Sequence, residues 1–114
     1  MASDYEAKVA EWEVHRAKWR AETDVLIELE RDFVAEFQRD EALRLEWVAK
    51  YDAALEVQDQ SGIAAYMTAA EEIRNRQALC SAALAQVRGD YETITKALPP
   101  RPRRSWGQLL GFVK

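Results

Sequence analysis

His15 is the only histidine and Cys80 the only cysteine in this 114-residue sequence. Glu11 stands four residues before His15, so the two share a helical face and could form a metal or acid–base pair. A di-metal helical bundle needs Glu-x-x-His units from two helices, and the sequence has none. We therefore interpret Glu11 and His15 as a surface ion pair on a helix.

A nucleophilic cysteine needs a neighbouring base or a positive field to form its thiolate. Cys80 stands in the uncharged stretch "ALCSA", and we expect the one histidine to lie far from it. We interpret it as a small core residue. The sequence also has no phosphate loop, dinucleotide-binding glycine pattern or zinc-ligand spacing. It therefore predicts no catalytic residue, no cofactor and no metal, and so no enzyme.

The charges are unevenly distributed. Residues 1–60 contain 16 acidic and 8 basic side chains, residues 61–98 contain four of each, and residues 99–114 contain four basic side chains and no acid. The acidic first half repels phosphates, which disfavours DNA or RNA as a partner. The short basic tail is attracted to acidic surfaces, whether on this chain or on another protein.

The compartment is inferred from what the sequence lacks. The start "MASDYEAKVAE" has no basic region followed by an apolar core, so we expect no Sec signal. No apolar run reaches the roughly 18 residues of a membrane span, and the tail is too short for strong membrane binding. A single cysteine allows no internal disulfide. We expect a cytoplasmic protein.

Large apolar residues recur every seventh position in the first half, as Tyr5, Trp12, Trp19, Leu26 and Phe33. Neither glycine nor proline occurs before Gly62, and Ser3 with Glu6 forms a capping box. These features predict a helix over about residues 3–58. Asp40 interrupts the apolar series and could instead cap a second helix that starts at Glu41, but Trp47 returns in phase and favours one continuous helix.

The stretch "DQSG" at residues 59–62 predicts a turn, with Ser61 as the cap of a second helix over about residues 62–98. This helix carries a heptad seam with alternating steps of three and four. The seam consists of Ile63, Tyr66, Ala70, Ile73, Gln77, Cys80, Leu84, Val87, Tyr91, Ile94 and Leu98. Gln77, its one polar member, either sets the register of the helices or lies partly exposed against a polar neighbour. "LPPRP" ends the helix.

The two helices and their short turn predict an all-α fold, a long antiparallel coiled-coil-like hairpin over residues 1–98, followed by a Pro/Arg spacer and a short apolar tail at 99–114. Residue 63 is expected near 57, and residue 98 near 22. The first helix would then overhang the second by about 20 residues, which leaves Trp12 and Trp19 without a partner in the hairpin.

Exposed tryptophans need a cover, because a buried large apolar side chain contributes about 1.5–3 kcal/mol. Three covers remain open: the tail of the same chain, a second copy in a two-fold dimer, or a hydrophobic groove of another protein. The residues expected to form this contact are Tyr5, Val9, Trp12, Trp19, Trp106, Leu109, Leu110 and Phe112.

Two functional hypotheses follow. The first is a non-enzymatic protein-binding regulator, expected to be a homodimer, that occludes or sequesters a partner protein through the aromatic helix face. The alternative is a structural, scaffolding or chaperone-like coiled coil in a phage or secretion assembly. A regulator should form a small defined complex, whereas a structural component should polymerise.

Overall fold

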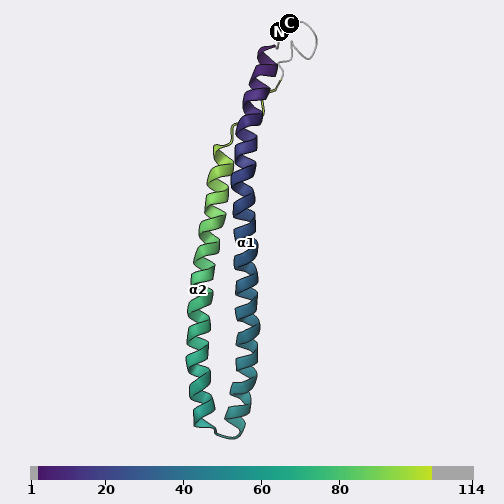
Figure 1. The fold of residues 1–114 in the computed structure, drawn as a ribbon. Helices are drawn as coiled ribbons and strands as arrows, with labels where there is room; N and C mark the ends of the chain where they lie inside the picture. The colour runs from purple at the N-terminus through teal and green to yellow at the C-terminus, as the bar shows by residue number, and fades with distance from the viewer. Residues whose placement is uncertain (1–2, 104–114) are drawn as a thin grey trace. The chain divides into compact units, whose positions relative to one another are not determined.

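The structure is a computed structural model that describes residues 3–103. Helix α1 spans Asp4–Glu56 and helix α2 spans Gln60–Ala97, and no strand occurs among these residues (Figure 1). The predicted all-α helical hairpin is therefore confirmed. The described residues divide into two compact units, a hairpin unit, Leu26–Gly89, and an end unit that joins residues 3–25 to residues 90–103.

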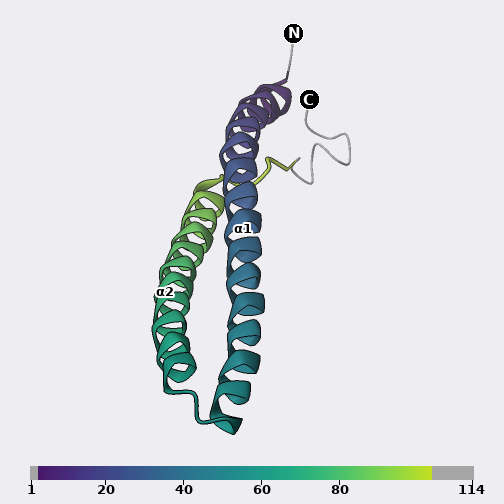
Figure 2. The ribbon, with the colours of Figure 1, turned by 60° about the horizontal axis from the view of Figure 1, so that its bottom comes forward.

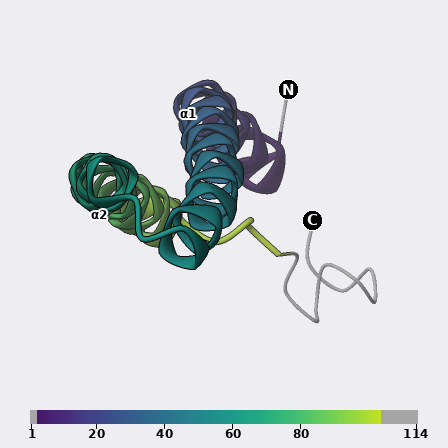
Figure 3. The same cartoon turned by 90° about the horizontal axis from the view of Figure 1, so that it is seen from below.

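In the hairpin unit, α1 and α2 lie side by side and run in opposite directions (Figures 1 and 2). The view from the turn in Figure 3 shows one layer of two helices in this unit. Each helix therefore has a single neighbour here, and only the residues along the line of contact can be buried. α1 continues through Asp40 without a break, so no second helix begins at Glu41.

The turn differs from the predicted one at residues 59–62, because α1 ends in a Schellman motif. The Asp59 amide donates to the Ala54 carbonyl at 2.9 Å, and the Gln58 amide donates to the Leu55 carbonyl at 3.2 Å. Gln58 has a φ of 53° at the position where glycine is usual. The motif reverses the chain by Asp59, whose carbonyl accepts from the Ile63 amide at 3.0 Å.

Asp59, and not Ser61, is therefore the residue that precedes α2. Ser61 and Gly62 lie in the first turn of that helix. Gly62 serves a close approach between the helices: a Cβ atom there would lie 3.0 Å from the Cβ of Ala54 and 2.8 Å from a carboxylate oxygen of Asp59. Glycine is therefore suited to this position because it is small enough to lie next to α1, and not because of a special turn conformation.

The seam predicted for α2 is confirmed in its central part. Ile73, Cys80 and Val87 are buried, and Ile73 is only 1% exposed. Most other members of the seam are half-buried, although Tyr91 is exposed. The Cys80 thiol donates to the Phe33 carbonyl at 3.0 Å, which confirms this cysteine as a core residue.

The seam of α1 contains a second heptad series that the every-seventh pattern did not include. It lies four residues after the first series, and its half-buried or buried members are Val9, Thr23, Glu30, Phe37, Arg44 and Tyr51, while Arg16 is in phase with them but exposed. Tyr51 stacks on Tyr66 of α2 with ring centroids 4.4 Å apart. Thr23 is 2% exposed, and its hydroxyl donates to the Arg20 carbonyl at 3.2 Å. Polar residues in this series conceal it from a search for apolar periodicity.

The end unit begins with the predicted capping box. The Glu6 amide donates to the Ser3 hydroxyl oxygen at 3.1 Å, and the Ser3 amide donates to the Glu6 carboxylate at 3.4 Å. After α2, residues 98–103 continue without helical structure and cross α1 (Figure 2). Neither helix combines the length and the apolar character that a membrane crossing requires.

Replacing Ile73 by alanine should lower the free energy of unfolding by about 2–4 kcal/mol, because the residue is buried and residues 3–103 provide no third helix to refill the space. Leu79→Ala, at a leucine that is 73% exposed, is the matched control and should change it by less than about 0.5 kcal/mol. Urea unfolding followed by circular dichroism measures both. Equal losses of unfolding free energy in the two variants would contradict the assignment of Ile73 to the buried seam.

Replacing Gln58 by glycine should stabilise the chain by about 0.5–1 kcal/mol, because glycine adopts a φ of 53° without the steric cost that a Cβ atom brings. The same urea titration measures the change. Gln60→Gly, just inside α2, should instead destabilise it. A loss of stability in the Gln58 variant would contradict the Schellman geometry.

Candidate protein-binding site

The predicted aromatic face is the N-terminal part of α1 in the end unit. Tyr5, Val9, Trp12 and Trp19 follow the steps of four, three and seven that keep residues on one side of a helix, and all four are half-buried. The capping box at Ser3 fixes the start of α1 and so places Tyr5 in its first turn. These four residues therefore share one side of α1, and their role in binding a partner stays a prediction.

The prediction that Trp19 has no partner within the hairpin is wrong, whereas Trp12 meets the segment that begins at Pro99, which is part of one of the three covers left open. The Trp19 indole N–H donates to the Thr95 hydroxyl oxygen at 3.1 Å, and the Trp12 indole N–H donates to the Pro99 carbonyl at 2.8 Å. Both indoles therefore have partners within their own chain. For Trp12, the non-helical segment after Ala97 advances roughly 3.3 Å per residue against 1.5 Å in a helix, so Pro99 reaches further along α1 than a continued helix would.

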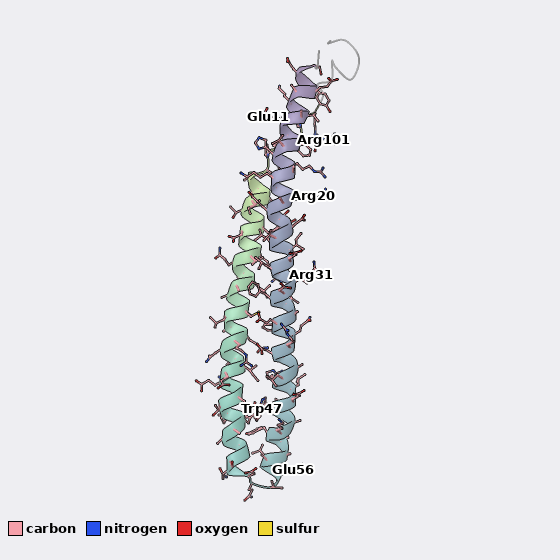
Figure 4. All side chains as sticks on the ribbon, viewed as in Figure 1. Glu11, Arg20, Arg31, Trp47, Glu56 and Arg101 are labelled. Carbon is pink, nitrogen blue, oxygen red and sulfur yellow. The ribbon has the colours of Figure 1, made fainter. Side chains whose placement is uncertain are left out.

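Two arginine side chains lie near the Trp12 ring, one from α1 and one from the segment after α2. The guanidinium carbon of Arg16, one turn further along α1, lies 5.7 Å from the ring centroid. Arg101 comes from the segment after α2 and lies beside the N-terminal part of α1 (Figure 4), also at 5.7 Å from the ring centroid. Cation–π attraction at this distance contributes roughly 0.5–1 kcal/mol at an exposed site.

A shallow groove of about 270 Å³ lies next to Trp19. Its walls come from α1, with His15 and Lys18, and from the end of α2, with Ile94 and Leu98. The volume is below the roughly 300–1,000 Å³ of sites that enclose small molecules.

The residues first considered for chemistry are not assembled into a reactive group. His15 and Glu11 are both exposed, and no hydrogen bond or ion pair joins them in the described part of the chain. Among residues 3–103, no three histidine, cysteine or acidic side chains are grouped so that they could hold a metal ion. Trp106, Leu109, Leu110 and Phe112, the tail residues assigned to the site, lie outside the described residues.

A polar cluster in the hairpin unit holds the most perturbed titratable group. Glu41 accepts from the Arg44 guanidinium at 3.0 and 3.1 Å and from the Gln77 amide at 3.0 Å. These hydrogen bonds, that from Arg44 foremost, lower the pKa of Glu41 from 4.5 to about 2. Next to it, Arg76 pairs with Asp40 at 3.1 Å. The cluster joins α1 to α2 and explains how Asp40 and Gln77 fit in the seam.

Sequence reasoning missed Thr95, Pro99 and Arg101 as parts of the aromatic face. The threonine offers a hydroxyl on the last turn of α2, and the proline offers a carbonyl just beyond it. The signal was present in "TKALPPR", where a helix end leaves carbonyls without helical donors. No periodic pattern marks such partners, because they depend on where two segments meet.

Comparison of the chain with models of protein families, with curated proteins and with solved structures found no match.

Acid should remove the contribution of Glu41 to stability. Its pKa is about 2 in the folded chain against 4.5 as the ordinary value, so the contribution is complete above pH 4.5 and is lost as the pH falls toward 2. Glu41→Gln should therefore show a shallower fall in the free energy of unfolding over this window. Urea titrations at several pH values measure it.

Glu46→Gln is the matched control for this experiment, because Glu46 is an exposed acid on the same helix that makes no ion pair among the described residues. Its stability should follow that of the unaltered chain across the window. Identical pH profiles for the two variants would contradict the role assigned to the Arg44 and Gln77 hydrogen bonds.

Proposed function

We propose that this chain is a non-enzymatic protein-binding regulator that occludes or sequesters a partner protein through the aromatic face of α1. The observation that carries the proposal is the state of Trp12 and Trp19. Both indole N–H groups have acceptors within the chain, while both rings stay only half-buried. Such rings offer apolar surface to a partner without leaving a polar atom unsatisfied when the partner covers them.

The arrangement also favours binding through preorganisation. The hydrogen bonds to Thr95 and Pro99 hold the two indoles in place before any partner arrives. A side chain that is already fixed loses less conformational freedom on association, which otherwise costs about 0.5–1.5 kcal/mol for each immobilised side chain. Tryptophan and arginine are among the residues that most often dominate binding energy, and Arg16 and Arg101 lie beside Trp12.

The mechanism is steric. The partner would accept the rings of Trp12 and Trp19 in an apolar groove, and acidic groups at its rim would meet Arg16 and Arg101. A target whose own assembly or activity needs that groove is blocked while the hairpin is bound. The proposal places the chain in a reducing compartment such as the cytoplasm, where the buried Cys80 thiol remains free. Tyr5 and Val9 extend the same face toward the start of α1.

The proposal is tested with a Trp12→Ala/Trp19→Ala double variant and capture from cells that naturally produce the chain, followed by mass spectrometry. Proteins retained by the unaltered chain should be lost. With a purified partner, the double variant should weaken binding by at least about 2 kcal/mol, measured by calorimetry. Loss of the tryptophans should leave most of the helical circular dichroism signal, since both lie outside the hairpin unit.

Val14→Ala is the matched control, because Val14 is an exposed apolar residue of the same part of α1 and lies off the seam. It should retain the same proteins as the unaltered chain. Retention of an unchanged set by the double variant would contradict binding through the aromatic face. Recovery of long polymers of the chain itself would favour the scaffolding alternative.

A further inference from the structure

α1 carries a second apolar stripe in the hairpin unit, one residue after the first seam series. Its members are Ile27, Val34, Glu41, Val48 and Leu55, each seven residues from the next. Ile27 and Leu55 are each 46% exposed, and Val34 and Val48 are half-buried. Leu45 adds an exposed apolar side chain on the same side. α2 covers the first seam and contacts the stripe at Glu41 through Gln77, while the apolar members of the stripe keep exposed surface on which a further helix could pack.

The spacing of the stripe is symmetric about its central residue, Glu41. Val34 and Val48 lie seven residues on either side of Glu41, and Ile27 and Leu55 lie fourteen. A helix that packs antiparallel against its own copy brings residues at equal distances from the two-fold axis together. With the axis at Glu41, Ile27 would meet Leu55 of the second copy, and Val34 would meet Val48.

The charges beside the stripe fit the same arrangement. Arg31 lies ten residues before Glu41 and Asp52 lies eleven after it, on the side that adjoins the stripe. Arg31 is on the side of α1 away from α2 (Figure 4). Neither residue makes an ion pair with another described residue. In the two-fold arrangement, each arginine faces the aspartate of the other copy, which gives two intermolecular ion pairs.

Glu41 does not oppose this arrangement, although two copies of it would meet at the axis. Arg44 donates to each carboxylate within its own chain at 3.0 Å, so each glutamate reaches the axis already paired. The centre of the contact then carries two acids and two arginines. A parallel pairing of the same stripes would instead place Arg31 against Arg31 and Asp52 against Asp52, which is repulsive at both sites.

We propose that two copies of this chain associate through the Ile27–Leu55 stripe of α1 as an antiparallel two-fold dimer, fixed in register by ion pairs between Arg31 and Asp52. This places the expected homodimer on a face distinct from the aromatic one. The stripe extends over about 42 Å of helix, which gives a contact of several heptads. Binding of a different protein to the aromatic face does not depend on this dimer, and the two proposals stand or fall separately.

Exchanging the charges of Arg31 and Asp52 tests whether the partner is a second copy of the chain and whether the two copies are antiparallel. Arg31→Asp and Asp52→Arg should each raise the dimer dissociation constant roughly tenfold, because each turns two attractive pairs into repulsive ones. The double variant Arg31→Asp/Asp52→Arg restores opposite charges across an antiparallel contact and should recover the original constant within about threefold. Sedimentation equilibrium of the full chain over a concentration series measures all of them.

Arg39→Asp is the matched control, because Arg39 is an exposed arginine off the stripe on the same helix, and it should not change the dissociation constant. Val48→Glu should abolish the dimer while circular dichroism stays helical. A chain that sediments as a monomer at every concentration overturns the proposal. Two other results also overturn it. One is a double charge variant whose dissociation constant is raised by the product of the factors found for the two single variants. The other is a Val48→Glu variant whose dimer dissociation constant equals that of the unaltered chain.

Discussion

The limited contact between two helices is the constraint on which the hairpin unit depends. With only one neighbour in this unit, each helix buries the residues that face the other and leaves its remaining surface in water. Few residues meet this condition fully, and Ile73 at the centre of α2 is the most buried of them. Stability then rests on a narrow line of contacts, and the rest of the helix surface is exposed.

This constraint also explains why polar residues take part in the seam. The cluster around Glu41 joins the helices through side chains long enough to reach water at their ends, so no charge is fully desolvated. Hydrogen bonds from Arg44 and Gln77 have directional requirements that apolar contacts lack. Such a cluster favours one register between the helices, whereas a uniform apolar seam would tolerate sliding.

The end unit combines the same helix with a different kind of partner. Trp19 contacts the last turn of α2, and Trp12 contacts the carbonyl of a proline beyond it. The non-helical segment after α2 offers free carbonyls that a helix would have used internally. The aromatic face and the second apolar stripe therefore belong to different units.

The sequence by itself determined the two helices and the seam of α2, because a stretch without glycine or proline and a repeat of three and four residues are local properties. It also marked Cys80 as a core residue. Only the tertiary structure decided where the tryptophans find their partners, how α1 passes Asp40, and which residue precedes α2. Those outcomes depend on Pro99, Arg76 and the Schellman motif at Gln58, which act through contacts and backbone geometry that no periodic pattern encodes.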